Sequence, residues 1–239
     1  MNHWKINIFL SFFIAILLVG CQESIDSVIQ KNIEVRGGEK NFRKIRTVSM
    51  KINLNTLGMD VPVRIFISLP GSIRTEMHVN GQSIVTVLNN NQAGAIVDGN
   101  FTALDENGVK DLQKNLQSQL NYFKSELFDY KKQGAVIKSV AKENFKDKPA
   151  IKIRLDYPDG VTTYLFIDQK TYLNIATRTE KQVNGQLMQT ETVYKDYRSV
   201  DGLMVPFTIE VSSGAMMIAT MHLDSLSFNK PMDKTLFQI

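Results

Sequence analysis

Hydrophobic and polar residues alternate along most of the chain beyond residue 47. The alternation is clear over residues 48–54 and again over residues 61–67, with Gly58-Met59-Asp60 as a turn between them. A period of two is typical of strands that bury one face. Asn80-Gly81 and Asn184-Gly185 are typical of tight antiparallel hairpins. Further strands are expected at about residues 73–79, 82–88, 93–98, 136–143, 150–157, 161–167, 172–183, 186–197, 207–212 and 216–228.

Two segments have helical spacing instead. Apolar residues recur every three or four positions over residues 25–33, with Ser24 or Asp26 as a cap and Gly37-Gly38 as the stop. A second apolar stripe, Val109, Leu112, Leu116 and Leu120, lies between about residues 105 and 132. The pattern therefore predicts a mainly β (α+β) fold: one long antiparallel meander with helices covering one face.

The predicted strands share one apolar face. It comprises Met50, Ile52, Leu54, Val63, Ile65, Ile67, Met77, Val79, Ile151, Ile153, Leu155, Leu165, Ile167, Ile209, Val211, Met217 and Met221. Packing of a core against the helices explains such a face without any ligand. The other interpretation is a surface that accepts variable apolar shapes, for which flexible methionine is well suited.

Composition excludes several classes of function. The formal net charge is +4 with both signs interspersed, so we expect no nucleic-acid partner. Beyond residue 20 the chain has two histidines, His78 and His222, and one cysteine, so we expect no metal site and no cofactor. No nucleophile or phosphate-loop motif is present. A converging carboxylate pair such as Asp98 and Asp156 would instead make the chain a hydrolase.

The first 21 residues have the layout of an export signal. Lys5 precedes an apolar run from Ile6 to Leu18, which is shorter than the ~20 residues that span a bilayer. The segment ends in Leu18-Val19-Gly20-Cys21, which resembles the lipobox of bacterial lipoproteins. The resemblance implies a signal peptide over residues 1–20, lipidation of Cys21, and one domain over residues 21–239 that is anchored to a membrane. Gln22 replaces the aspartate associated with inner-membrane retention, which favours the outer membrane, facing the periplasm.

Four further motifs occur in a recognisable order. They are Glu-Val-Arg-Gly-Gly-Glu-Lys at 34–40, Gly58-Met59, Leu-Pro-Gly-Ser-Ile-Arg at 69–74, and Asp-Tyr-Arg-Ser-Val-Asp-Gly-Leu-Met-Val-Pro-Phe at 196–207. This order resembles the outer-membrane lipoprotein-sorting protein family, relatives of the periplasmic lipoprotein carrier and its lipid-anchored receptor. The resemblance covers roughly residues 24–239.

The resemblance implies a strongly curved, unclosed half-barrel with a helical lid at about residues 109–130. Between sheet and lid, an apolar cavity would accept acyl chains or lipoproteins, lined by the apolar face above together with Leu112, Leu116 and Leu120. Such a protein would be a monomer without catalytic activity and could take part in lipoprotein sorting. An exposed apolar loop like the receptor's would lie at Gly58-Met59-Asp60 or Asn100-Phe101. The alternative is an envelope regulatory or interaction module without a lipid ligand, which a large apolar patch on the convex face would favour.

Overall fold

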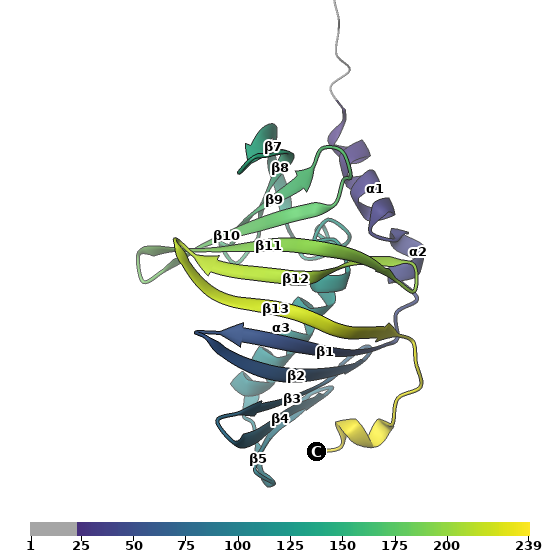
Figure 1. Ribbon diagram of the computed structural model, residues 1–239, viewed down its shortest axis with the longest axis vertical. Coiled ribbons are helices and arrows are strands. Elements are labelled where there is room, and N and C mark those ends of the chain that lie inside the picture. The colour runs from purple at the N-terminus through teal and green to yellow at the C-terminus, as the bar shows by residue number, and fades with distance from the viewer. Residues whose placement is uncertain (1–22) are drawn as a thin grey trace, which may run out of the picture.

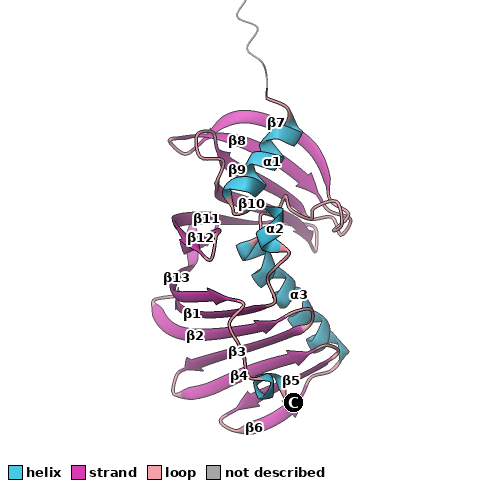
Figure 2. Cartoon of the chain, turned by 90° about the vertical axis from the view of Figure 1, so that its right-hand side faces the viewer, coloured by secondary structure: helices cyan, strands magenta, loops and turns pink. Residues whose placement is uncertain are grey.

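The computed structural model describes residues 23–239, so the expected signal peptide and Cys21 lie outside the described residues. Thirteen strands form one antiparallel sheet that curves but does not close (Figures 1 and 2), in the order β6-β5-β4-β3-β2-β1-β13-β12-β11-β10-β9-β8-β7. Their bounds are β1 (Thr47–Thr56), β2 (Met59–Ser68), β3 (Ser72–Val79), β4 (Gln82–Asn89), β5 (Gln92–Val97), β6 (Asn100–Ala103), β7 (Val136–Phe145), β8 (Lys148–Asp156), β9 (Thr162–Asp168), β10 (Asn174–Val183), β11 (Gln186–Val200), β12 (Leu203–Ser213) and β13 (Met216–Phe228). Because β1 pairs with β13, both ends of the meander meet in the middle of the sheet.

The helices α1 (Ile25–Val35), α2 (Gly38–Phe42) and α3 (Glu106–Phe123) lie on the concave side of the sheet (Figure 2), and a short 3-10 helix η1 (Lys234–Phe237) is near the C-terminus. Ser24 caps α1 by accepting a hydrogen bond from the Ser27 amide. Gly37 separates α1 from α2 with φ +120°, and a Cβ there would lie 2.5 Å from the Gly202 carbonyl oxygen. Only glycine satisfies both conditions, so the predicted stop is confirmed.

The mainly β half-barrel with covering helices is confirmed, and the two Asn-Gly hairpins close β3–β4 and β10–β11. Strand β6 was not predicted. The expected helical segment also ends earlier, at Phe123 instead of about residue 132. The Ser125 hydroxyl accepts from the Leu127 amide and donates to the Asn32 side chain, and these two bonds replace a further helical turn.

Two apolar cores lie on the concave side. In the α3 core, α3 packs on β1–β5, β12 and β13, with Phe42, Leu120 and Phe123 among its buried residues. In the α1 core, Val28 of α1 and Leu127 pack on β8 and β9. The two cores lie towards opposite ends of the half-barrel, and the candidate site lies between them, against β9 to β13.

Candidate functional site

The structure divides the predicted apolar face between the two cores. The α3 core contains Met50, Ile52, Leu54, Val63, Ile65, Ile67, Met77, Val79, Leu112, Leu116, Leu120 and Met221. The α1 core contains Ile151, Ile153, Leu155, Leu165 and Ile167. Three predicted residues belong to neither core: Ile209 and Val211 line a cavity between the cores, and Met217 lies beside a hairpin tip with half of its surface exposed. Most of the predicted residues are therefore brought together, but as buried core side chains.

Between the two cores lies a cavity of about 380 Å³, which we call the middle cleft. Its volume falls within the range of about 300–1,000 Å³ that is usual for ligand sites. The end of α3 and the residues after it form one wall, and β9 to β13 form the other. The lining residues are Ser118, Asn121, Tyr122, Glu126, Tyr157, Thr163, Thr177, Thr179, Thr192, Tyr194, Ile209, Val211 and Met221.

Threonines form the sheet wall of the middle cleft. Thr163 of β9 lies opposite Thr179 of β10, and Thr177 of β10 lies opposite Thr192 of β11. Sequence reasoning missed these residues because it followed only apolar alternation. A signal was present: threonine occupies every second position at 177–179 and 190–192, and Arg178 and Glu191 occupy the intervening positions. This alternation places threonine on the face that carries isoleucine and leucine elsewhere in the sheet.

A partly buried carboxyl lies at one end of the cleft. Glu126 accepts hydrogen bonds from the Asn174 side-chain amide (2.5 Å) and from the Tyr194 hydroxyl (3.1 Å). Asn174 in turn accepts from the Asn32 amide at 2.6 Å, which ties α1 to β10. Burial raises the pKa of Glu126 above its ordinary value, and the positive charge of Arg36 opposes this rise. The raised pKa means that the neutral carboxylic acid is more strongly favoured over the carboxylate in this site than it is in water.

The tyrosines around Glu126 are held in their neutral form. Burial, reinforced by the charge of Glu126, raises the pKa of Tyr157 to about 12 and that of Tyr194 well above its ordinary range. Burial also raises the pKa of Tyr197 to about 12, and its hydroxyl donates to the Asn174 carbonyl oxygen at 2.8 Å. At neutral pH these groups are therefore protonated hydroxyls, and those of Tyr194 and Tyr197 donate hydrogen bonds.

Arg36 fixes the C-terminal end of α3. Its Nη2 donates to the carbonyl oxygens of Tyr122 and Phe123, both at 3.0 Å, and its Nε donates to the Met204 carbonyl oxygen at 2.9 Å. The carbonyls of Tyr122 and Phe123 lie in the last turn of α3 and have no partners within the helix, so the guanidinium satisfies them. The Tyr122 hydroxyl adds a bond to the Pro206 carbonyl oxygen. The α3 terminus is thereby joined to β12.

The rest of α3 is held less tightly and has open space along both edges. On one edge, a crevice of about 90 Å³ lies between α3 and β13 and shares Ser118, Tyr122 and Met221 with the middle cleft. On the other edge, a cleft of about 390 Å³ separates α3 from the ends of β3 and β4. There, exposed Gln113 donates to the Asn90 carbonyl and the Asn91 side chain at 3.4 and 3.3 Å. These long, solvent-exposed bonds constrain the helix only weakly.

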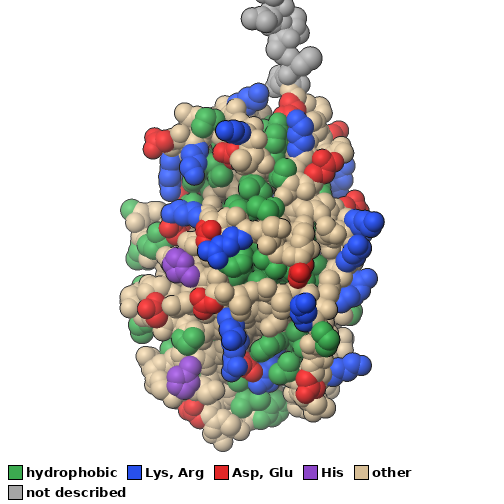
Figure 3. Space-filling view, turned by 45° about the vertical axis from the view of Figure 1, so that its right-hand side comes forward, with side chains coloured by type: hydrophobic (Ala, Val, Ile, Leu, Met, Phe, Trp, Pro, Cys, Tyr) green, Lys and Arg blue, Asp and Glu red, His purple; other side chains and the backbone are tan. Residues whose placement is uncertain are grey.

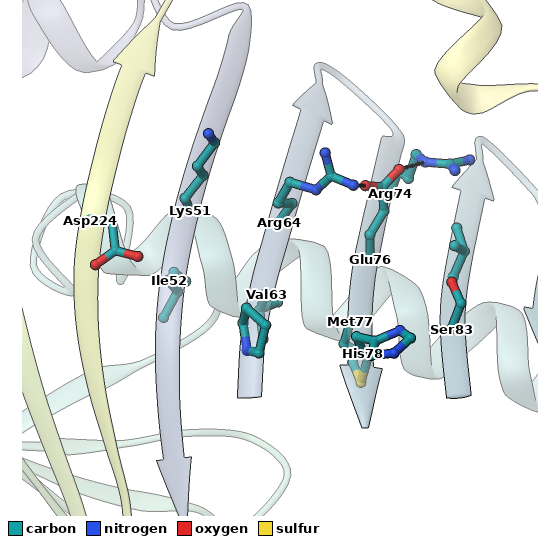
Figure 4. Close-up of a pocket in the computed structure, with 12 residues that line it drawn as sticks. Lys51, Ile52, Val63, Arg64, Arg74, Glu76, Met77, His78, Ser83 and Asp224 are labelled. Atoms are coloured by element: carbon teal, nitrogen blue, oxygen red, sulfur yellow. Dashed lines mark hydrogen bonds and ion pairs between the residues drawn. The ribbon is translucent and has the colours of Figure 1, made fainter. Parts of the chain in front are cut away.

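The largest pocket, about 510 Å³, lies on the convex face, with α3 behind the sheet (Figure 4). Glu76 forms ion pairs there with Arg64 (2.8 Å) and Arg74 (2.6 Å), and Lys51 and His78 lie nearby. The Arg64 side chain is exposed, so its pair with Glu76 contributes little to stability, whereas the Arg74–Glu76 pair is partly buried. This part of the convex face is therefore charged. Across the face in Figure 3, lysines and arginines are interspersed with acids.

Exposed apolar side chains instead gather at hairpin tips. Leu187 and Met188 of the β10–β11 hairpin, Met216 of the β12–β13 hairpin and Leu57 of the β1–β2 hairpin are 57 to 77% exposed. These three hairpins lie along one edge of the half-barrel (Figure 1, left). Of the two loops expected to expose an apolar side chain, Met59 is 44% and Phe101 is 52% exposed. We call the first three hairpin tips the apolar rim.

The structure does not bring the candidate catalytic carboxylates together. Asp98 follows β5 and accepts from the Ser83 amide, whereas Asp156 ends β8 and is paired with Arg154; β5 and β8 lie near opposite ends of the sheet. In residues 23–239, no three His, Cys, Asp or Glu side chains form a candidate metal site. Over the same residues, no helix is both long enough and apolar enough to cross a membrane.

Solved structures with the same architecture include proteins from three bacteria. A LolA superfamily protein from Nitrosomonas europaea has a TM-score of 0.56 at 11% identity and covers 91% of this chain and 98% of its own. A DUF1329 family protein from Desulfovibrio piger has a TM-score of 0.58 at 7% identity, covering 90% and 98%. A putative outer membrane lipoprotein-sorting protein domain from Vibrio parahaemolyticus has a TM-score of 0.55 at 8% identity, covering 88% and 94%.

This chain has the fold of those three proteins. The resemblance that the sequence motifs indicated is thus confirmed for the fold. Sequence identities of 7 to 11% carry no information about the ligand. No family model matches the sequence, and no curated protein matches it.

Proposed function

We propose that the chain is a lipid-anchored envelope protein without catalytic activity that binds acyl chains or lipoproteins between the sheet and α3. The observation that carries the proposal is the setting of α3. This helix covers an apolar sheet face, has open clefts along both edges, and is bonded to other elements mainly at its two ends.

An acyl chain requires apolar area more than directional partners, because each CH₂ group removed from water contributes about 0.8 kcal/mol. The crevice beside Met221 and Leu223 opens towards the α3 core and supplies such area. A longer chain fits only if α3 moves away from the sheet. Arg36 holds the C-terminal end of α3, and the Leu104 amide, just before the helix, donates to the Ala93 carbonyl oxygen at 2.9 Å. The helix would therefore have to loosen one of these attachments to open, a gating motion of the kind that lids perform.

The proposal also includes a lipid anchor at Cys21. Lipidation of Cys21 would place the domain, residues 21–239, at a membrane, and two or more acyl chains make such attachment stable. We place it at the outer membrane facing the periplasm and acting as a monomer. A role in lipoprotein sorting follows if the bound acyl chain belongs to another lipoprotein. The similarity in fold to a putative lipoprotein-sorting domain supports this role.

Native mass spectrometry tests the proposal on residues 22–239 purified from a bacterial periplasm without detergent. Trp4, the only tryptophan, is absent from that segment, so uptake of a fluorescent fatty acid can be measured without tryptophan background. We expect a co-purified lipid. Met221→Gln, which places an amide in the crevice, should reduce its occupancy. Thr220→Gln is the matched control because the neighbouring side chain points to the other face. A lipid-free mass with no probe uptake would overturn the proposal.

The apolar rim favours a second function, an interaction module that binds a partner protein. Exposed contiguous apolar side chains are typical of interaction sites. A Leu187→Ser/Met188→Ser variant separates the two functions. Loss of an envelope partner with lipid uptake unchanged would support the module, whereas unchanged partner content would exclude the rim as its interface.

A further inference from the structure

We infer that the middle cleft is a recognition site for an uncharged, hydroxyl-rich group, such as a sugar ring. The inference deepens the proposed function, because the group would be the polar end of an amphiphile whose apolar part lies beside α3.

The lining of the cleft matches that chemistry. Eight of its thirteen side chains carry a hydroxyl group, from serine, threonine or tyrosine. A hydroxyl donates one hydrogen bond and accepts two, so it pairs with ligand hydroxyls in either direction. No lysine or arginine lines the cleft, so a phosphate or carboxylate would be desolvated there without a compensating charge.

Three of the four threonine hydroxyls in the cleft remain available to a ligand, whereas that of Thr177 is paired with the Tyr194 hydroxyl at 3.3 Å. Thr163 and Thr179 have their oxygens 3.5 Å apart, at the limit of a hydrogen bond, and Thr192 lies in the adjacent strand. Valine has nearly the same shape as threonine and would fill these strand positions with equal ease. Threonine on the inward face is therefore the feature that core packing leaves unexplained.

Glu126 and Arg36 argue against a charged ligand. Burial raises the pKa of Glu126, and in its neutral form the carboxyl donates and accepts like a hydroxyl. In its ionised form, the charge of Arg36 already opposes the burial effect. The neutral form therefore has no charge that calls for a cationic head group, and Arg36 partly offsets the charge of the ionised form.

The cleft also continues into apolar space. Ser118, Tyr122 and Met221 belong both to the cleft and to the crevice between α3 and β13. A molecule with its polar end among the threonines would therefore direct an attached hydrocarbon chain along α3 towards Leu223. A glycolipid has this form, and a free sugar would occupy the polar end alone.

A series of octyl amphiphiles with one tail and different heads tests the inference. Octyl glucoside, octylphosphocholine and octyltrimethylammonium are titrated by calorimetry into residues 22–239, each below its critical micelle concentration. Methyl glucoside provides the head without the tail. Thr179→Val/Thr192→Val removes two hydroxyls from the cleft, and Thr208→Val/Thr220→Val, on the opposite face of β12 and β13, is the matched control.

We expect octyl glucoside to bind about tenfold more tightly than the zwitterionic octylphosphocholine and the cationic octyltrimethylammonium, and the Thr179→Val/Thr192→Val variant to lose that preference. The control variant should keep it. Binding of methyl glucoside alone would identify a free sugar as the source of the group, and its failure to bind would identify a glycolipid head.

Equal affinity for all three amphiphiles would overturn this inference and leave the proposed acyl site standing, because only the tail would then be recognised. Preference for octyltrimethylammonium would overturn it in favour of a cation site at Glu126. Binding of none of the amphiphiles would contradict both this inference and the proposed function.

Discussion

The ends of the half-barrel and its middle use the same strands in different ways. At each end, isoleucine and leucine on the concave face are covered by a helix, and Ile153 and Leu165 are completely buried. In the middle, threonine and tyrosine take the corresponding positions and border open space. Apolar alternation therefore marks the core, and the positions where the inward face becomes polar mark the candidate site. Four predictions test this contrast, beginning with the largest expected effect.

Truncation in the cores should be most damaging. Ile153→Ala in the α1 core and Ile65→Ala in the α3 core should each lower the free energy of unfolding by about 2–5 kcal/mol, because both leave cavities in close-packed surroundings. Urea denaturation measures the change. A loss below about 1 kcal/mol at either site would show that the core is loosely filled, and it would remove the distinction between ends and middle.

Arg36→Lys should have the next largest effect. Lysine cannot reproduce the planar fork that reaches three carbonyl oxygens, and hydrogen bonds to a charged donor contribute about 1.5–3 kcal/mol each. We expect a loss of about 2 kcal/mol or more and faster hydrogen exchange at the end of α3. Arg64→Lys, at an exposed ion pair, is the control and should change stability little. Unchanged exchange in Arg36→Lys would mean that α3 is anchored elsewhere.

Glu126→Gln should change how stability depends on pH. Because burial raises the pKa of Glu126 in the folded protein above its ordinary value of 4.5, the folded state binds more protons than the unfolded state between those two values. Stability should therefore fall as pH rises from about 4.5 through the folded pKa, by up to about 1.4 kcal/mol per pH unit. The charged and titratable groups facing Glu126 are Arg36, Tyr157, Tyr194 and Tyr197.

The glutamine variant lacks that titration, so its stability relative to the wild type should rise with pH across the same window. Urea denaturation at several pH values measures the difference between the two proteins. A difference that stays constant would show that Glu126 is not desolvated, and the cleft would then be wetter than the structure indicates.

The smallest effect is expected at Thr192→Val, because valine keeps the shape and the strand preference of threonine. The free energy of unfolding should change by no more than about 0.5 kcal/mol. A loss comparable to that of Ile153→Ala would show that the threonine wall supports the fold, and it would remove the reason to assign that wall to a ligand.

The fold could be predicted from local pattern because each signal acts over a few residues. Alternation gave the strands, Asn-Gly gave two hairpins, and Gly37-Gly38 gave the end of α1. Strand β6 was missed because its four residues are too few to show alternation. The end of α3 was misplaced because Ser125 is bonded to Asn32, which lies 93 positions away in the chain.

The candidate site was only partly predictable. Ile209, Val211 and Met221 were among the predicted residues and line the middle cleft, but Glu126, Tyr194 and the threonines were missed. Their importance depends on which strands become neighbours across the sheet and on where α3 ends. The succession of hairpins indicates which strands become neighbours only in outline, and long-range contacts decide where α3 ends.

Photolabelling would locate the ligand most directly. A palmitate analogue with a diazirine at the end of its chain is bound to residues 22–239 and irradiated, and the adducts are mapped by mass spectrometry. The account predicts adducts on α3 at residues 118–123 and on β13 near Met221, which together line the crevice. Adducts confined to the apolar rim at Leu187, Met188 and Met216 would contradict it.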